Sequence, residues 1–398
     1  MPRRNLISLF SGAGGLDLGL EAAGFDARVC VEMDSTCVRT LRHNRPWPVI
    51  ERDIHEVSSE EILTTAKLEK GEADLLCGGP PCQPFSKSAY WARGDTKRLD
   101  DPRASTLGEY MRVLEDTLPR AFLLENVYGL TYEGKDEGMQ FLRESLRKIN
   151  ERTGASYSFR FSVLNSADFG VPQIRERVFI IGAREGHDFE FPRPQFSDPR
   201  KNGDQETLFE LPPYRTAWDA LGDLDHIDHG DELNVTGKWA ALLPSIPEGE
   251  NYLWHTERGG GAPIFRWRSR YWSMLLKLAK ERASWTVQAQ PGSAIGPFHW
   301  RNRRLSPREL CRIQTFPDDY EVQGGITAVQ RQLGNAVPSA IAEVLGLAIR
   351  AQFFGDDVRT EATLIPPRRE LAEPHPVEPV PERYLDGIEW GSFSAASS

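Results

Sequence analysis

The sequence predicts an α/β protein with a doubly wound, mostly parallel sheet and a second, smaller domain. The first third of the chain alternates short apolar runs with longer polar stretches of helical length, a pattern typical of strands connected by helices. Residues 186 to about 300 are rich in Gly, Pro and Trp and show little periodicity, which indicates a separate domain. With 398 residues, of which 39% are hydrophobic, the chain is long enough to bury more than one core.

Buried strands are expected where short apolar runs are flanked by polar or turn-forming residues. These runs are LISLF (6–10), ARVCVE (27–32), ADLLCGG (73–79), AFLLEN (121–126) and RVFIIG (177–182). A later helix should begin at Ser306-Pro307-Arg308-Glu309, because this spacing forms a capping box with proline at the first helical position. Pro338 similarly precedes an apolar helix over 339–354. The expected organisation is a main domain (1–185), a second domain (186–300), a return to the main domain (301–355) and a tail (356–398).

The net charge of −10 is unevenly distributed along the chain. Residues 203–257 hold twelve acidic and two basic residues, whereas residues 258–304 hold ten basic residues, one acid (Glu281) and seven aromatic residues. A basic segment interleaved with aromatic side chains is typical of a nucleic-acid surface. The alternative is a solvated charged face above an ordinary aromatic core.

The two ends of the chain and its cysteines limit which classes of protein the sequence fits. The tail combines nine acidic and four basic residues with six prolines and few apolar runs, which predicts a loosely attached segment. The apolar run in MPRRNLISLF is too short for a signal peptide or a membrane span, so we expect a cytoplasmic protein that contacts no membrane. The five cysteines form no CxxC pair and no zinc-like spacing, so neither disulfides nor a metal site is expected.

Ligands of an open α/β sheet bind outside the carboxyl ends of its strands. The first strand is followed by Ser11-Gly12-Ala13-Gly14-Gly15, small residues that let a ligand approach the backbone, although their spacing is neither GxGxxG nor a P-loop. The second strand ends at Glu32, the distance downstream that is typical of an acid binding ribose hydroxyls. Asp53 could accept a hydrogen bond from an adenine amino group. For either acid, the alternative is a helix cap.

One thiol is restricted by the residues on both sides of it. In GGPPCQPFS (78–86), Cys82 lies between Pro81 and Pro84, which leave the backbone few conformations. A thiol held in a fixed direction indicates that Cys82 is a nucleophile. The alternative is a buried structural cysteine. Because the neighbouring strand ends in Glu125-Asn126, a thiol and a carboxyl group could face one substrate.

Two arginines flank Glu176 at the start of the fifth expected strand. The period of a strand places Arg175 and Arg177 on one face, where they could converge on an anion. The alternative is a surface ladder of ion pairs.

Taken in order, these segments resemble the motifs of one enzyme family. LFSGAGGLDLGLEAAGF, VEMD, GGPPCQPFS, LLENV, FGVPQIRERVFIIG, RRLSPRELCRIQTFPDDY and QLGNAVPSAIA are together similar to the motifs of DNA (cytosine-5) methyltransferases. The likeness covers residues 5–182 and 300–350, and Thr286-Val287 looks like a Thr-aliphatic pair of the family's target recognition domain. It implies a Rossmann-like S-adenosylmethionine-dependent methyltransferase fold for 1–185 and 301–355, with a target recognition domain at 186–300.

The resemblance implies S-adenosyl-L-methionine as methyl donor. The residues of the implied donor pocket are Phe10, Gly12, Ala13, Gly15, Glu32, Met33, Asp53, Ile54, Pro80, Asn335 and Val337. Glu32 would bind the ribose hydroxyls, and Asp53 with Ile54 would fix the adenine edge. Met33 stands where the family often has an aromatic residue, which weakens the expectation that this side chain stacks on the adenine.

The implied reaction is methylation of C5 of a cytosine within a specific duplex DNA sequence. Cys82 would attack C6, Glu125 would hydrogen-bond N3 and the exocyclic amino group, and Asn126 would support the Glu125 strand end. Arg175 and Arg177 would bind cytosine O2, a backbone phosphate or the catalytic loop. The cytosine must be flipped out of the duplex, because C6 is reached from the ring face. Residues 83–99 have the charge and flexibility of a lid that closes over the DNA.

Other interpretations are compatible with parts of the sequence. They are a tRNA cytosine-5 methyltransferase of the same fold, a nucleotide-dependent oxidoreductase and a catalytically silent DNA-binding regulator. The large region after Arg184 favours duplex DNA, the missing GxGxxG disfavours the oxidoreductase, and the intact catalytic set disfavours the silent regulator. The expected setting is a bacterial or phage restriction-modification system. We expect a monomer associated with the nucleoid, and a cognate restriction endonuclease that forms no stable complex with it.

Overall fold

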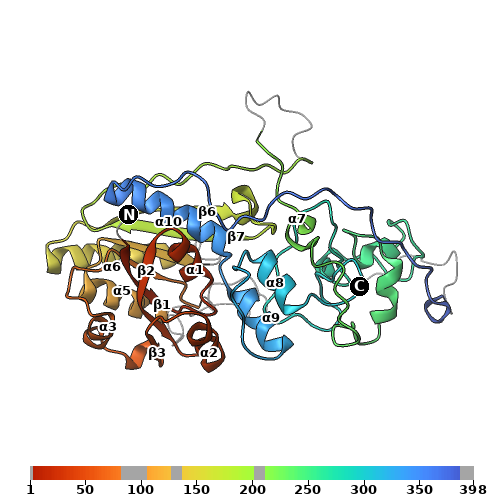
Figure 1. Cartoon of the computed structure of the whole chain (residues 1–398), viewed down its shortest axis with the longest axis horizontal. Helices are drawn as coiled ribbons and strands as arrows, with labels where there is room; N and C mark the ends of the chain where they lie inside the picture. Colours follow the sequence, from red (N-terminus) through yellow and green to blue (C-terminus); the bar gives the residue numbers. More distant parts are fainter. Residues whose placement is uncertain (1–2, 82–104, 127–136, 201–210, 386–398) are drawn as a thin grey trace.

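The structure is a computed structural model that describes residues 3–81, 105–126, 137–200 and 211–385. Within these residues, the centre is a seven-stranded sheet in the order β3-β2-β1-β4-β5-β7-β6. The strands are β1 (Arg4–Leu9), β2 (Phe25–Glu32), β3 (Val49–Glu51), β4 (Leu75–Gly78), β5 (Ala121–Asn126), β6 (Ser158–Asn165) and β7 (Glu176–Ala183). Figure 1 shows this sheet with its helices at one end of an elongated molecule, and a less regular region at the other.

The sheet is parallel on one side and antiparallel on the other. β1 pairs in parallel with β2 and β4, β2 with β3, and β4 with β5. β7 runs antiparallel to both β5 and β6. The prediction of a doubly wound, mostly parallel sheet is confirmed, and a strand is present at each of the five predicted apolar runs. The prediction omits both edge strands, because β3 is only three residues long and β6 is half-exposed without an apolar run.

Helices cover both faces of the sheet. The helices that flank the sheet are α1 (Gly15–Ala22), α2 (Ser35–Asn44), α3 (Ser59–Ala66), α5 (Ser105–Thr117), α6 (Glu137–Thr153) and α10 (Ser339–Phe354). The helices α7 (Ala217–Leu221), α8 (Pro307–Ile313) and α9 (Ile326–Asn335) lie beside the sheet, toward the less regular region (Figure 1). Leu6 and Leu75 belong to the core beneath α1 and α10, whereas Ile7 and Leu76 belong to the core beneath α3, α5 and α6. Because both faces are covered, the strands are apolar at consecutive positions rather than alternating.

The two predicted C-terminal helices are present. α8 begins in the predicted capping box, in which Ser306 Oγ accepts the Glu309 N–H at 3.3 Å and the Glu309 carboxylate accepts the Ser306 N–H at 2.7 Å. α10 occupies residues 339–354, as predicted, and packs on α1. By length and composition alone, the stretch Ile326–Phe354 could cross a membrane, but most of it is buried inside the protein. Its apolar composition is therefore that of core helices.

The region between α7 and α8 has few regular elements and a small core of its own. Leu242, Leu243, Ile246, Tyr252, Leu275 and Phe298 form this buried cluster, which we call the distal core. Short 3₁₀ turns carry part of it, including η5 (Ala240–Ser245) and η6 (Tyr252–His255). The distal core is separate from the two cores that cover the sheet.

The chain after α10 differs from the loosely attached tail that the sequence predicts. Residues 356–385 follow an extended path from α10 to the distal core (Figure 1). Leu364 and Ile365 pack against the core beneath α10, and Val380 and Tyr384 pack against the distal core. Composition did not indicate this attachment, because it depends on single contacts with residues far away in the sequence.

Gly19 allows α1 and α10 to pack in close contact. A Cβ at this position would lie 2.1 Å from the carbonyl oxygen of Ser339 and 2.5 Å from Cβ of Ala342. The backbone contact can be relieved only by moving the helices apart, so Gly19→Ala should lower the free energy of unfolding by about 1–3 kcal/mol. Urea denaturation measures this change.

Gly108→Ala in α5 is the matched control, because a Cβ there would meet nothing within 4 Å. This exchange should leave the free energy of unfolding unchanged, or raise it by up to about 1 kcal/mol through helix propensity. An equal loss of stability in both variants would contradict the packing argument.

Candidate functional site

Two residues of the implied donor pocket have left-handed backbone conformations directly after β1. The φ angle is 55° at Phe10 and 54° at Gly12. A bulky residue is uncommon in this region, and such strain is typical of ligand sites. A Cβ on Gly12 would meet nothing within 4 Å, so open space lies beside this backbone.

Glu32 at the end of β2 is held in place by backbone groups. One carboxylate oxygen accepts the N–H of Gly12 at 2.7 Å, and the other accepts the N–H of Asp34 at 2.7 Å. Burial raises the pKa of Glu32 above its usual value, and these two hydrogen bonds oppose the rise. Each fixed oxygen has a further lone pair with which it can accept a ligand hydroxyl. The adjacent Met33 side chain is 66% exposed.

Asp53 caps the short helical turn η1 (Ile54–Glu56) that follows β3. Its Oδ1 accepts the N–H of His55 at 3.0 Å and lies 2.6 Å from His55 Nδ1. These hydrogen bonds lower the pKa of Asp53. From α5, Arg112 Nη2 donates to the carbonyl oxygens of Ile54 at 3.2 Å and Val57 at 2.9 Å. Arg112 therefore fixes the turn that carries Asp53 and Ile54.

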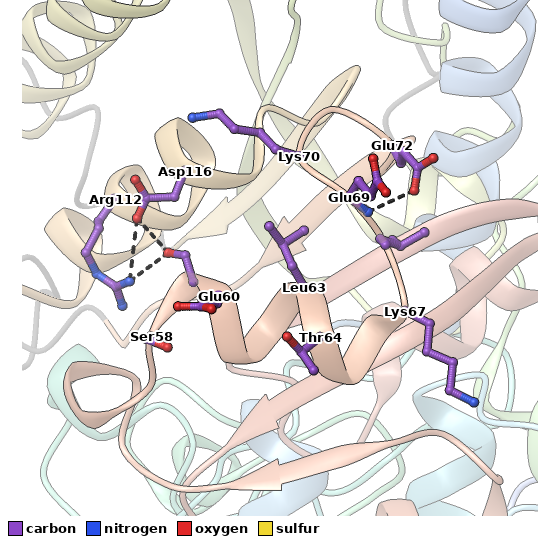
Figure 2. Close-up of a pocket in the computed structure, with 12 residues that line it drawn as sticks. Ser58, Glu60, Leu63, Thr64, Lys67, Glu69, Lys70, Glu72, Arg112 and Asp116 are labelled. Carbon is purple, nitrogen blue, oxygen red and sulfur yellow. Dashed lines mark hydrogen bonds and ion pairs between the residues drawn. The ribbon is translucent and has the colours of Figure 1, made fainter.

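Figure 2 shows Arg112 and Asp116 at one end of an open groove of about 810 Å³ between α3 and α5. Acidic and basic side chains, among them Glu60, Lys67 and Lys70, share its lining, so no single sign of charge selects a ligand there. Arg112 acts as a support of the turn after β3. The sequence did not indicate this residue, because its partners lie more than 50 positions earlier.

The link between α9 and α10 lies directly against the glycine loop that follows β1. A Cβ on Gly15 would lie 2.2 Å from the carbonyl oxygen of Val337, which shows how closely the two segments approach. Ala13 is buried, and its carbonyl oxygen accepts the hydroxyl of Tyr320, 307 positions later, at 2.9 Å. Asn335 is exposed at this link. The fold thus brings the two ends of the predicted set together.

Asp17 on α1 is a buried acid that the sequence analysis missed. Its side chain is fully buried, and Oδ2 has no hydrogen-bond partner among the described residues. Cys30 Sγ lies 4.0 Å from Oδ1. Burial raises the pKa of Asp17 to about 6. The carboxyl group lies on the helix that begins directly after the glycine loop.

Glu125 and Arg177 form an ion pair between neighbouring strands. Arg177 Nε lies 3.1 Å from Glu125 Oε1. Burial raises the pKa of Glu125, whereas the charges of Arg177 and Arg175 oppose this rise. A Cβ on Gly79 would lie 3.0 Å from Glu125 Oε2. The backbone that leads toward Cys82 therefore passes directly beside the carboxylate.

Cys82 and the lid expected at 83–99 lie outside the described residues. Just before them, the carbonyl oxygen of the buried Pro80 accepts the side-chain amide of Asn126 at 3.4 Å. Asn126 therefore joins the end of β5 to the segment that precedes Cys82. The four cysteines within the described residues are buried, and burial raises the pKa of each thiol, which disfavours the reactive thiolate. They are Cys30, Cys37, Cys77 and Cys311.

Arg175 and Arg177 have different surroundings, although the sequence places them on one face. Arg177 is partly exposed and pairs with Glu125. Arg175 is 1% exposed, and its guanidinium donates to the carbonyl oxygens of Val287 at 3.3 Å and Gly334 at 2.8 Å. Burial lowers the pKa of Arg175. Arg175 therefore joins the start of β7 to residue 287 and to the end of α9.

Further hydrogen bonds strengthen the same junction. Gln173 accepts the N–H of Val287 at 2.9 Å and donates to Gln314 Oε1 at 2.8 Å. Thr286 Oγ1 donates to the carbonyl oxygen of Ile174 at 2.7 Å. The Thr286-Val287 pair is thus docked on the segment that precedes β7.

The basic segment 258–304 has both an exposed and a buried set of aromatic residues. Its exposed aromatic residues are Trp267, Tyr271, Trp272 and Trp285, whereas Phe298 and Trp300 are buried. The ring centroids of Trp272 and Trp285 are 5.0 Å apart, and the Arg258 guanidinium lies 4.5 Å from the Trp267 ring. The segment therefore has an exposed aromatic and basic face as well as aromatic residues that belong to the core.

Comparison with known proteins decides the family. A sequence profile of the C-5 cytosine-specific DNA methylase family matches residues 4–351. This chain belongs to that family. The Type II methyltransferase M.SacI of Streptomyces achromogenes is 40% identical to this methylase over 384 residues, which cover 91% of this chain and 96% of that protein. M.NgoFVII of Neisseria gonorrhoeae is 31% identical over 337 residues, which cover 84% of this chain and 83% of that protein.

The likeness extends to solved structures. A protein encoded within an E. coli prophage matches 88% of this methylase and 99% of its own chain with a TM-score of 0.62. At 23% identity, this match concerns the fold alone. It agrees with the predicted methyltransferase fold.

Family membership makes this methylase a DNA (cytosine-5) methyltransferase that depends on S-adenosylmethionine. The described residues fit such a donor, because Gly12 leaves open space beside the backbone and Glu32 presents two fixed oxygens next to it. Among the residues that the structure describes, no three His, Cys, Asp or Glu side chains gather as metal ligands would.

Asp17→Asn should stabilise the methylase, and more strongly at neutral than at acidic pH. The pKa of about 6 in the folded state lies above the usual 3.8, so folding loses stability as the pH rises between these values. The amide removes this buried charge. In urea denaturation, the gain in free energy of unfolding should reach up to about 3 kcal/mol at pH 7 and approach zero near pH 4.

Asp188→Asn is the control for this pH series, because Asp188 pairs with Arg160 on the exposed surface. Its effect should stay within about 1 kcal/mol at every pH. An Asp17→Asn effect that does not grow between pH 4 and pH 7 would contradict the burial of a charged carboxylate.

Proposed function

We propose that this methylase transfers a methyl group from S-adenosylmethionine to C5 of a flipped-out cytosine in a specific duplex DNA sequence, through a covalent bond between Cys82 and C6. The observation that carries this proposal is the largely buried Glu125 carboxylate, which pairs with Arg177 and lies beside Gly79, three residues before Cys82. A carboxyl group whose pKa is raised can hold a proton for N3 of the base.

The donor would bind outside the carboxyl ends of β1 and β2. Glu32 would accept hydrogen bonds from the ribose hydroxyls, and the turn that Arg112 supports would present Asp53 and Ile54 to the adenine. The remaining lining residues would be Phe10, Gly12, Ala13, Gly15, Met33, Pro80, Asn335 and Val337. When bound, the donor supplies an electrophilic sulfonium methyl group, whose transfer to a carbon nucleophile breaks the carbon–sulfur bond and leaves a neutral thioether.

Cytosine C5 is a poor nucleophile, so the proposed reaction begins with addition at C6. The Cys82 thiolate forms a bond to C6, and the electrons of the C5–C6 double bond move onto C5 and the ring. Glu125, hydrogen-bonded to N3 and the exocyclic amino group, stabilises this charge. C5 then takes the methyl group. A base acting through water removes the C5 proton, the double bond forms again, and the bond to Cys82 breaks to release the thiolate.

The neighbouring residues would orient these groups. Asn126 would fix the Pro80 carbonyl and so aim the Cys82 segment. Arg177, which is partly exposed, would contact cytosine O2 or a backbone phosphate. Because Arg175 donates to protein carbonyls, we propose that it positions the expected target recognition domain (186–300) instead of contacting the substrate.

The setting of the enzyme follows from its relatives. M.SacI and M.NgoFVII are Type II methyltransferases, which supports host protection in a restriction-modification system. The proposal includes a monomer that acts on duplex DNA of the nucleoid in the cytoplasm. A cognate endonuclease would act as a separate protein.

Duplex DNA with 5-fluorocytosine at the target position should trap the enzyme covalently, because fluorine at C5 cannot leave as a proton after methyl transfer. Bisulfite sequencing of DNA from cells that express the enzyme first identifies the target. The complex should survive denaturing electrophoresis and require both the methyl donor and Cys82. Cys82→Ser should abolish it, since the pKa of a serine hydroxyl is far too high for a comparable nucleophile at neutral pH.

Two further variants sharpen this experiment. Cys77→Ser changes a buried thiol on β4 and should leave trapping intact. Glu125→Gln should slow trapping by about 100-fold or more, because the charge on the ring would lose its proton donor. An adduct at another residue, or DNA methylation by Cys82→Ser, would refute the mechanism. Methyl incorporation into tRNA but not into DNA would refute the substrate.

Glu32→Ala should weaken the binding of S-adenosylmethionine by about tenfold or more, because its ribose hydroxyls would lose a charged hydrogen-bond acceptor. DNA binding should stay unchanged, because Glu32 is not proposed to contact DNA. Calorimetry with S-adenosylmethionine and with duplex DNA measures both affinities. Glu51→Ala is the control, since Glu51 is an exposed acid at the end of β3 that pairs with Arg42. Wild-type donor affinity in Glu32→Ala would rule out the ribose assignment.

A further inference from the structure

Residues 356–385, which we call the strap, are attached first to α10. Glu343 of α10 is fully buried, and its carboxylate accepts the backbone N–H of Thr363 at 2.8 Å and that of Leu364 at 2.9 Å. The Thr363 hydroxyl donates to the same carboxylate at 2.8 Å, and Arg359 forms an ion pair with it. Among the described residues, the recorded partners of this buried carboxylate all come from the strap.

The middle of the strap is attached to α7. Asp219 is 2% exposed and accepts Arg368 Nη1 at 2.9 Å and the backbone N–H of Arg369 at 2.9 Å. Next to it, Trp218 Nε1 donates to the carbonyl oxygen of Glu370 at 2.7 Å. The strap therefore crosses α7 in a fixed register.

The last part of the strap is attached to the distal core. The backbone N–H of His375 donates to Glu248 at 2.6 Å, and the N–H of Glu378 donates to the carbonyl oxygen of Pro244 at 3.0 Å. The Tyr384 ring stacks on Trp239 with 5.7 Å between the ring centroids.

The contacts of Tyr384 complete the attachment. Its hydroxyl donates to the carbonyl oxygen of Lys238 at 2.7 Å, and with Val380 it packs against the distal core. The strap thus ends on a different hydrophobic core from the one on which it begins.

We propose that the strap is a positioning element that holds the distal core, and with it the basic and aromatic surface of residues 258–304, at a fixed place relative to the catalytic edge of the sheet. This inference rests on the proposed methylation of duplex DNA. The substrate must contact the catalytic edge and the recognition surface at the same time. A distal core that moved freely would lose this freedom on binding, which would weaken the affinity for DNA.

The buried acids argue against a passive tail. Without the strap, Glu343 would lose the four groups that the strap directs at its carboxylate, and Asp219 would lose Arg368 and Arg369. A buried charge without partners is strongly unfavourable, so the folded catalytic domain is built to receive the strap. The Arg175 junction holds residues 286 and 287, whereas the strap attaches to the distal core itself, through Val380 and Tyr384.

The test uses Arg368→Ala and Tyr384→Ala in the full chain, one on each side of the junction between α7 and the distal core. Each variant should raise the KM for target DNA about threefold to tenfold and leave the KM for S-adenosylmethionine within about twofold of wild type. Arg368→Lys keeps the cation opposite Asp219 and should recover most of the loss. Arg193→Ala removes an exposed arginine outside the strap and should change neither KM.

The double variant separates a strap from two local contacts. If the two residues acted independently, the rise in KM of the double variant would equal the product of the two single rises, as is usual for sites more than about 10 Å apart. If both residues hold one strap, either change alone already releases it. The rise in KM of the double variant should then be smaller than that product. Fully multiplying effects, equal rises in both KM values, or single variants that match Arg193→Ala would overturn the inference. If the wild-type protein methylates no DNA, the proposed function fails instead.

Discussion

The buried guanidinium of Arg175 is the constraint on which the arrangement of the site depends. A cation in the protein interior is stable only where other groups supply hydrogen-bond acceptors, and here the acceptors are the carbonyl oxygens of Val287 and Gly334. The start of β7, the Thr286-Val287 segment and the end of α9 must therefore stay together. Because Arg177 lies two residues after Arg175, the same junction also fixes the position of the partner of Glu125.

The same constraint holds for the buried negative charge of Glu343, which also needs hydrogen-bond partners from another segment. Its carboxylate is as buried as the Arg175 guanidinium, and its partners come from the strap, 16 to 21 positions later in the chain. In both places, a buried charge finds its partners only when a segment outside its own helix or strand is docked on it. Buried charges add little net stability, but they penalise every arrangement in which a partner is missing. We infer that these two charges select one placement of the Thr286-Val287 segment and of the strap.

The sequence predicted the elements whose signals are local. The strands follow from apolar runs, α8 from its capping box, and Glu32 and Glu125 from their positions at strand ends. Contacts between residues that only the folded chain brings together could not be predicted from local sequence patterns. The period of a strand places Arg175 and Arg177 on one face, but it does not show that one of them meets carbonyl oxygens from residues 287 and 334. Likewise, an acidic and proline-rich composition predicted a loose tail, although the attachment of residues 356–385 depends on single arginines, backbone groups and one tyrosine.

In the proposed reaction, Glu125 is subject to two opposing influences. Burial favours the protonated carboxyl group, which can donate to N3, whereas Arg177 at 3.1 Å favours the carboxylate. A cytosine that enters this site would exclude water from the pair, and a shift of Arg177 toward cytosine O2 or a phosphate would remove the nearest positive charge. Both changes would raise the pKa of Glu125. Substrate binding would therefore favour the protonated carboxyl group, which can donate to N3 while thiolate addition builds charge on the ring, although the same residue is ion-paired with Arg177 in the free enzyme.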